Sequence, residues 1–154
     1  MTLRLLQIGK TKEEWLKTAL AEYQKRLAAY YPLRIEELPD VSMRQTGNPD
    51  LVRQKEAALC LKRIGEDDFL ILLDETGELK SSLEFSAFLA NLSDRKKVCF
   101  LIGGAYGVSN TVKERADRVI SLSPLTFTHQ MVRLILMEQL YRAVMIQQRR
   151  SYHH

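Results

Sequence analysis

Two short runs made only of apolar residues constrain the fold of this 154-residue chain more than any other feature. Residues 69–73 read Phe-Leu-Ile-Leu-Leu, and residues 98–102 read Val-Cys-Phe-Leu-Ile. Both have the length of a β-strand, and neither alternates between apolar and polar positions. A strand without this alternation is buried on both faces, which is typical of a parallel sheet covered by helices on each side. The two runs therefore predict an α/β fold.

The rest of the chain alternates between strand and helix signals in the same way. Further strands are predicted at residues 3–8, 33–38 and 119–122, and a turn is predicted at residues 74–77. Helices are predicted near residues 49–64, 81–92 and 129–148, with Asn48 before Pro49 as the start of the first. Strands that alternate with helices favour a mainly parallel sheet flanked by helices.

Capping-box spacing, a hydroxyl residue followed three positions later by glutamate, marks two further helix starts. Thr11 with Glu14 predicts the first helix of the chain, and Ser81 with Glu84 predicts a later one. In the first helix, apolar residues recur every four positions and predict a stripe that packs on the core. These residues are Trp15, Ala19, Tyr23 and Leu27.

The last predicted helix is apolar around most of its circumference, from Met131 to Ile146. Such a helix needs two buried faces. One face can pack on the sheet. The other is explained either by a second subunit in a homodimer or by a helix buried at the centre of one chain, and the pattern does not separate the two.

Composition limits the classes of function. The net charge of +4 fits a polyanionic partner such as RNA, although a surface with extra lysine explains it equally well. The two cysteines, Cys60 and Cys99, have no CxxC spacing, which suits a reducing compartment. No secretory signal peptide, membrane span or metal-ligand spacing is recognisable. We therefore expect a soluble cytoplasmic protein without a metal.

Three loops at predicted strand ends are candidates for a binding site, because ligands of parallel sheets bind beyond the carboxyl ends of the strands. Asp74 opens the first loop, residues 103–107 form a Gly-Gly-x-x-Gly loop, and residues 122–127 lead into the last helix. Glycines after a buried strand let a ligand approach the backbone. The same glycines also occur in ordinary tight turns, so this loop alone is a weak signal.

Four segments together resemble one known family. They are Phe-Leu-Ile-Gly-Gly-Ala-Tyr-Gly at 100–107, Ser-Leu-Ser-Pro-Leu-Thr-Phe-Thr-His-Gln-Met-Val-Arg at 121–133, Glu-Gln-Leu-Tyr-Arg-Ala at 138–143, and Tyr-His-His at 152–154. The chain is similar over its whole length to the RlmH, or YbeA-type, family of SPOUT methyltransferases. The resemblance implies a single SPOUT domain over residues 1–154, whose C-terminal segment is threaded into a trefoil knot.

The resemblance also implies an activity. Members of this family form homodimers and use S-adenosylmethionine (S-adenosyl-L-methionine) to methylate N3 of a pseudouridine in 23S, large-subunit, ribosomal RNA, with a preference for assembled 70S ribosomes. Carried over by position, the cofactor-binding residues are Leu72, Leu73, Gly103, Gly104, Leu122, Ser123, Pro124, Leu125, Thr126 and Phe127.

Proton removal from N3 requires a base or a group that stabilises the imide anion. Candidates for this catalytic role are His129, Glu138, Tyr152 and His153. Candidates for RNA contact are Arg133, Arg142 and His154. Two alternatives remain at this point: a methyltransferase of the same fold that acts on transfer RNA, and an α/β domain that binds a small molecule without catalysis.

Overall fold

The computed structural model describes residues 1–152, in which five strands form one sheet in the order β2-β1-β4-β3-β5. Each neighbouring pair of strands is parallel, which confirms the prediction of a mainly parallel α/β sheet flanked by helices. The strands are β1 (Thr2–Ile8), β2 (Leu33–Leu38), β3 (Phe69–Leu79), β4 (Lys97–Ile102) and β5 (Arg118–Ser121). The helices are α1 (Glu14–Ala28), α2 (Met43–Thr46), α3 (Pro49–Arg63), α4 (Ser82–Ala90), α5 (Asn110–Arg115) and α6 (His129–Gln147).

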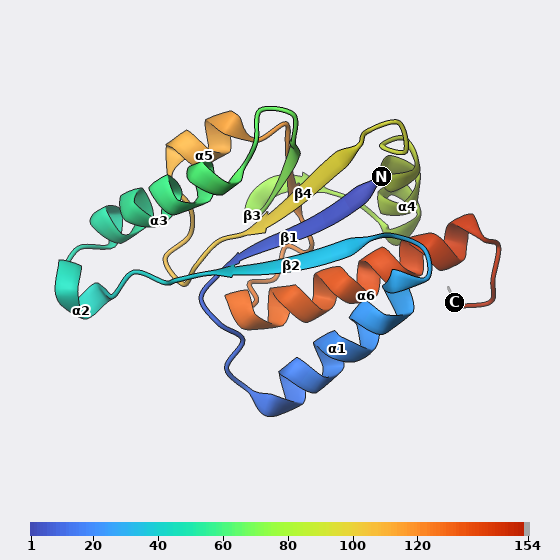
Figure 1. Cartoon of the computed structure of the whole chain (residues 1–154), viewed down its shortest axis with the longest axis horizontal. Coiled ribbons are helices and arrows are strands. Elements are labelled where there is room, and N and C mark those ends of the chain that lie inside the picture. The colour runs from blue at the N-terminus through green and yellow to red at the C-terminus, as the bar shows by residue number, and fades with distance from the viewer. Residues whose placement is uncertain (153–154) are drawn as a thin grey trace.

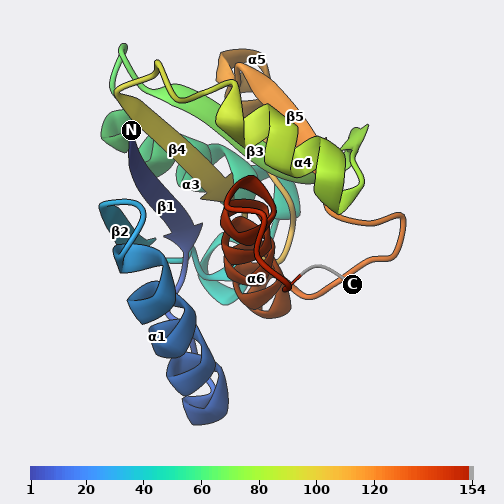
Figure 2. The same cartoon turned by 90° about the vertical axis from the view of Figure 1, so that its right-hand side faces the viewer.

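Helices cover both faces of the sheet (Figures 1 and 2). One face packs against α1, α4 and α6, and the other packs against α3 and α5. Successive side chains of β3 point to opposite faces. Ile71 and Leu73 join the core under α1, α4 and α6, whereas Leu70 and Leu72 join the core under α3 and α5. This explains why the run at residues 69–73 contains no polar residue.

The start of α1 differs from the prediction. The helix begins at Glu14, and no side chain caps its first turn. Thr11 is buried, and its hydroxyl accepts a hydrogen bond from Arg133 instead. The capping box predicted at Thr11 and Glu14 is therefore wrong, whereas the one at Ser81 and Glu84 is present.

The first half of the core stripe predicted for α1 is shifted by one position, whereas Leu27 is buried and Tyr23 packs against the core as predicted. The buried residues of this helix are Leu16, Leu20 and Leu27. Trp15 is 56% exposed, although its position fits the predicted spacing. The four-residue spacing matched two adjacent helix faces, and the leucines, not Trp15, occupy the face toward the sheet.

Strand β3 extends beyond the apolar run, so the prediction that it ends in a turn at residues 74–77 is wrong. Its pairing with β5 resumes at Glu78 after a register shift that follows Leu73. At Gly77 the backbone of β5 comes so close that an added Cβ would lie 2.6 Å from the carbonyl carbon of Ile120. Only glycine fits at this close approach of the two strands. The bulge leaves Asp74 and Glu75 outside the sheet pairing, at its carboxyl edge.

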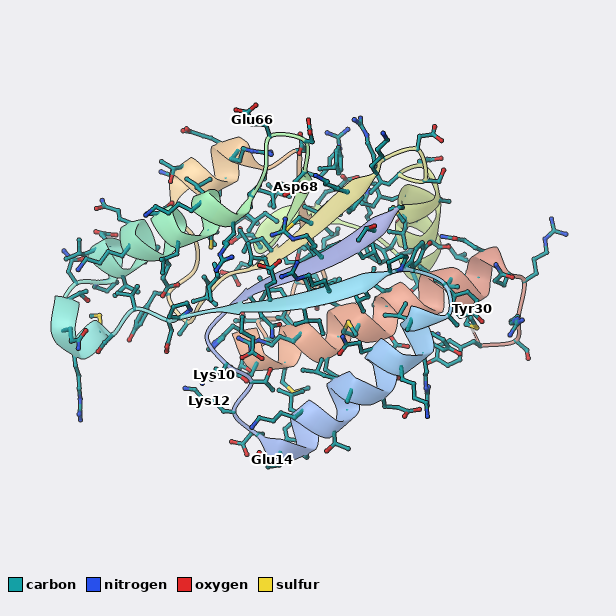
Figure 3. The ribbon with its side chains drawn as sticks, in the orientation of Figure 1. Lys10, Lys12, Glu14, Tyr30, Glu66 and Asp68 are labelled. Atoms are coloured by element: carbon teal, nitrogen blue, oxygen red, sulfur yellow. The ribbon has the colours of Figure 1, made fainter. Side chains whose placement is uncertain are left out.

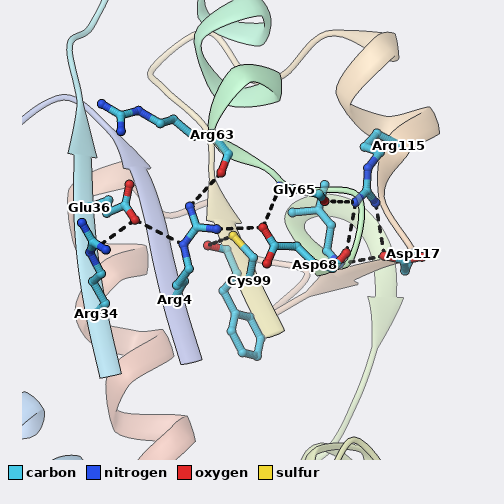
Figure 4. A network of polar contacts seen from close by, with 11 residues as sticks. Arg4, Arg34, Glu36, Arg63, Gly65, Asp68, Cys99, Arg115 and Asp117 are labelled. Atoms are coloured by element: carbon cyan, nitrogen blue, oxygen red, sulfur yellow. Dashed lines mark hydrogen bonds and ion pairs between the residues drawn. The ribbon is translucent and has the colours of Figure 1, made fainter. Parts of the chain in front are cut away.

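Charged side chains form a connected network near the amino-terminal edge of the sheet (Figure 4). Arg4 binds Glu36 at 3.2 Å and Asp68 at 2.7 Å. The buried Asp68 carboxylate also accepts a hydrogen bond from the Gly65 backbone N–H, and Arg115 donates to the carbonyls of Gly65 and Asp68. Each of these charges has a partner.

Within residues 1–152, no helix combines the length and the apolar composition needed to cross a membrane.

Candidate functional site

A cavity of about 760 Å³ opens at the carboxyl-terminal edge of the sheet. Its volume lies within the usual range for a small-molecule site. Its walls come from the segments that follow β3, β4 and β5 and from the first turn of α6. The lining residues are Leu73, Asp74, Glu75, Ile102, Gly103, Gly104, Ala105, Gly107, Val108, Ser121, Leu122, Ser123, Leu125, Thr126, Phe127, Thr128, His129, Gln130 and Val132.

The glycine loop after β4 is pressed against its surroundings. A Cβ added at Gly103 would lie 2.7 Å from a methyl carbon of Val108, and one added at Gly104 would lie 2.6 Å from Oε2 of Glu56. Arg53 of α3 donates a hydrogen bond to the Tyr106 carbonyl at 3.0 Å. The loop is therefore held in place by α3, with its backbone facing the cavity.

Glu56, which supports this loop from below, was not predicted from the sequence. Its side chain is buried beneath Gly104, and burial raises its pKa to about 7. The charge of Asp40 adds to this increase, and a hydrogen bond from the Val41 backbone opposes it. A glutamate on a charged helix gives no sequence signal of burial, because Lys55 and Glu56 look alike in the pattern of α3.

The segment between β5 and α6 is shaped by its own hydroxyl groups. Ser121 donates to the Ser123 carbonyl, and the Ser123 hydroxyl accepts from the Leu125 backbone N–H, each at 2.9 Å. Thr126 donates to Glu75 at 3.1 Å and so ties this segment to the bulge of β3. The side chain of Leu125 stays 70% exposed beside the cavity.

His129 lies at the first position of α6 and lines the cavity. Burial lowers the pKa of His129, and the charges of Arg133 and then Lys12 lower it further, while Asp40 opposes them. The imidazole is therefore favoured in its neutral form, in which one ring nitrogen can accept a proton.

Most predicted cofactor-binding residues line the cavity. Leu73, Gly103, Gly104, Leu122, Ser123, Leu125, Thr126 and Phe127 do so, whereas Leu72 and Pro124 do not. The side chain of Leu72 is fully buried in the core toward α3 and α5, on the opposite face of β3 from Leu73. The Leu72 side chain therefore points away from the cavity, and the assignment of Leu72 to the cofactor site stays a prediction.

The remaining catalytic candidates lie elsewhere. Tyr152 donates a hydrogen bond to Glu138 at 3.4 Å, and the Tyr152 and Tyr23 hydroxyl groups are also 3.4 Å apart. Burial raises the pKa of Tyr152, as do Tyr23 and Glu138. Neither Glu138 nor Tyr152 lines the cavity of its own chain. Their catalytic role stays a prediction, and His153 lies outside the described residues.

The three candidates for RNA contact also lie in different surroundings. Arg133 is completely buried, and its guanidinium donates to Ile8, Gly9 and Thr11. It cannot reach RNA, so this prediction is wrong. Arg142 forms an ion pair with Glu138 at 2.7 Å, and its RNA contact stays a prediction. His154 lies outside the described residues.

Asp74, Glu75 and Gln130 are lining residues that the sequence reasoning did not assign to the cofactor site. Asp74 and Glu75 directly follow a buried strand, and this position made the loop that Asp74 opens a candidate binding segment, although the family resemblance assigned neither residue to the cofactor. In residues 1–152, no group of three His, Cys, Asp or Glu side chains is arranged to hold a metal ion.

Comparison with known proteins identifies the family. The model of the family described as "Predicted SPOUT methyltransferase" matches residues 1–153. The chain belongs to the SPOUT methyltransferase family. Curated relatives in this family share its full length. The Geobacter sulfurreducens protein named ribosomal RNA large subunit methyltransferase H is 43% identical, with 100% of both chains covered. The protein of the same name from Geobacter metallireducens is 42% identical, with 100% of this chain and 99% of the relative covered.

The SPOUT fold is also found by structural comparison. The crystal structure of tRNA (m1G37) methyltransferase from Aquifex aeolicus matches 92% of this chain and 70% of its own, with a TM-score of 0.55 and 15% sequence identity. At this identity the likeness concerns the SPOUT fold alone. The trefoil knot in this chain stays a prediction.

Proposed function

We propose that this chain uses S-adenosylmethionine to methylate N3 of a pseudouridine in large-subunit ribosomal RNA. The observation that carries the proposal is the full-length identity of 43% with a SPOUT methyltransferase named for large-subunit ribosomal RNA. The cavity at the carboxyl edge supports it, because three loops and the first turn of α6 converge there. The chain would act as one domain over residues 1–154.

The residues around the cavity fit S-adenosylmethionine. Leu73, Ile102 and Leu122 offer apolar walls for an adenine ring, and the glycine loop exposes backbone groups for polar contacts. The carboxylates of Asp74 and Glu75 can balance the positive charge of a sulfonium and an amino group. When bound, the cofactor supplies an activated methyl group.

His129 is the one predicted catalytic residue among those described that lines the cavity. Its lowered pKa keeps the imidazole neutral near pH 7, so that it can accept the proton of a pseudouridine N3–H. The remaining N3 anion is a nucleophile whose reaction depends on its placement against the methyl donor. The neighbouring charges of Arg133 and Lys12 would stabilise this anion electrostatically.

The homodimer is part of the proposal. Trp15 on α1 is exposed, and on α6 the side chains of Leu134, Ile135 and Tyr141 are only partly buried. Helices α1 and α6 lie side by side (Figures 1 and 2), so one partner could cover these side chains together. Because Glu138 does not reach its own cavity, a catalytic role for the Glu138 and Tyr152 pair requires a second subunit. Light scattering at micromolar concentration should give twice the monomer mass, and a monomer mass would contradict the dimer.

The proposed substrate implies the cellular compartment in which the protein acts. An enzyme that modifies assembled 70S ribosomes works in the cytoplasm, and the proposal includes both this compartment and this preference.

The test uses radiolabelled S-adenosylmethionine and ribosomes from cells that lack the protein. Assembled ribosomes, separated large subunits and bulk transfer RNA are compared, and the labelled nucleoside is identified by mass spectrometry. Label on a pseudouridine of large-subunit RNA, mainly in assembled ribosomes, is the expected result. Label only in transfer RNA would contradict the substrate. Cofactor binding without any label would favour a binding domain without catalysis.

A further inference from the structure

The loop between β1 and α1 is fixed by the first turns of α6. Gln130 binds it with both ends of its side-chain amide. The Oε1 atom accepts from the Lys12 backbone N–H at 3.1 Å, and the Nε2 atom donates to the Lys10 carbonyl at 3.0 Å. Because Gln130 also lines the cavity, the loop is attached to the edge of the candidate site.

Arg133 completes this attachment from the next turn of α6. Its guanidinium donates to the carbonyls of Ile8 and Gly9 at 2.7 and 2.9 Å, and to the Thr11 hydroxyl at 2.9 Å. The Arg133 side chain is fully buried, and no carboxylate of residues 1–152 forms an ion pair with it. Burying a guanidinium against neutral partners is unfavourable. The three hydrogen bonds that Arg133 donates hold the loop between β1 and α1 against α6.

The loop presents two lysines to solvent. Lys10 and Lys12 are exposed on either side of the buried Thr11 (Figure 3). Neither lysine has an ion-pair partner among the described residues, unlike Lys17, which binds Glu14 at 2.9 Å. The Lys12 backbone is hydrogen-bonded to Gln130, which lines the cavity next to His129, so the lysine lies at the edge of the cavity. The fixed loop therefore holds positive charge beside the candidate catalytic residue.

We propose that Lys10 and Lys12 bind RNA phosphates next to the target nucleotide, and that Gln130 and Arg133 are positioning residues for them. The inference rests on the proposed function, because it concerns the RNA at the same site. An ammonium group is a strong point charge for phosphate. Holding two of them on a rigid loop reduces the ordering that binding requires. The loop lies at the edge of the cavity, where bound phosphates would align a base with His129.

The test compares two double variants with the same change of charge. Lys10→Ala/Lys12→Ala removes the proposed contacts, and Lys62→Ala/Lys97→Ala removes two exposed lysines near the amino-terminal edge. Ribosome binding is measured by co-sedimentation over a series of salt concentrations, and cofactor binding is measured by calorimetry. We expect the first variant to bind ribosomes at least tenfold more weakly, with a salt slope reduced by roughly 1–2. Its melting temperature and cofactor affinity should not change.

Other outcomes decide against the inference. Equal losses in both double variants would mean that net charge alone matters and would overturn it, as would unchanged binding by Lys10→Ala/Lys12→Ala. In Gln130→Ala, which keeps both lysines, weaker ribosome binding with an unchanged salt slope is expected from a positioning role. An unchanged affinity in this variant would overturn that role. Ribosome binding without methyl transfer by the unaltered protein would contradict the proposed reaction only, whereas no binding would overturn both.

Discussion

The buried ionisable side chains at the two edges of the sheet differ in their partners. Near the amino-terminal edge, Arg4 and Asp68 are joined in a network in which each charge has a partner (Figure 4). At the carboxyl-terminal edge, Arg133 is buried against neutral groups, and burial shifts the pKa values of His129 and Glu56 toward their neutral forms. The same strands reach both edges, so the difference comes from the loops that connect them at each edge.

This contrast indicates which edge serves stability and which serves chemistry. Fully paired charges resist rearrangement and lower the cost of burial. Groups with shifted pKa values near a cavity are typical of functional sites. Arg4 and Arg133 therefore have different roles, because Arg4 pairs with carboxylates and Arg133 binds neutral groups.

The largest effect is expected from His129→Ala. Removing a general base lowers turnover by roughly 10²–10⁴-fold. Cofactor affinity should stay within a factor of a few, because the histidine acts on the RNA base. Single-turnover methyl transfer and calorimetry measure the two quantities. Unchanged turnover would remove His129 from the mechanism and weaken the contrast between the edges.

Asp68→Asn should lower the stability of the fold and leave the candidate site unaffected. Breaking a buried charge network costs about 3 kcal/mol of unfolding free energy, which corresponds to a decrease of roughly 6–12 °C in melting temperature. Cofactor affinity should not change. Glu66→Gln is the matched control, because Glu66 is an exposed carboxylate two residues away, and this change should leave the melting temperature unaltered. A loss of cofactor binding in folded Asp68→Asn protein would show that the two edges are coupled.

Glu56→Gln tests the buried carboxyl under the glycine loop. The folded-state pKa of Glu56 is raised from 4.5 to about 7, so the folded state holds its proton more tightly than the unfolded state. Stability is therefore lost as the pH rises from about 4.5 to 7. Above pH 7 the free energy of unfolding of the variant should be about 1–3 kcal/mol higher than that of the unaltered protein. Between pH 4.5 and 7 it should depend less on pH. Urea unfolding measures the free energy, and an unchanged pH profile would mean that Glu56 ionises freely.

The smallest effect is expected from Lys12→Met. Removing a positive charge near His129 raises the pKa of the imidazole, although burial, the main cause of the lowered pKa, remains. NMR titration of the histidine ring signals measures the change. Lys17→Met, whose lysine binds Glu14, is the control. A lower pKa of His129 in Lys12→Met would contradict the placement of Lys12 near the ring.

The positions of the strands, the α6 boundaries and the loops after β4 and β5 could be predicted from the sequence, because apolar runs, caps and glycines are local signals. The extension of β3 beyond Leu73 could not, because it depends on the pairing with β5. Arg133 shows what could not be predicted. It was a candidate for RNA contact, yet its partners are Ile8, Gly9 and Thr11, more than a hundred residues earlier in the chain. The burial of Glu56 depends in the same way on contact with a distant loop. Pairings of this kind are set by the tertiary fold, and the composition of a single helix does not contain them.

Hydrogen–deuterium exchange with and without S-adenosylmethionine tests the assignment of chemistry to the carboxyl-terminal edge most directly. Saturating cofactor should slow amide exchange in residues 73–78, 102–108 and 121–130, and leave residues 62–68 and 115–118 unchanged. Equal or stronger protection of the two amino-edge segments would contradict the assignment, as would no protection of the three cavity segments at a cofactor concentration shown by calorimetry to saturate the protein.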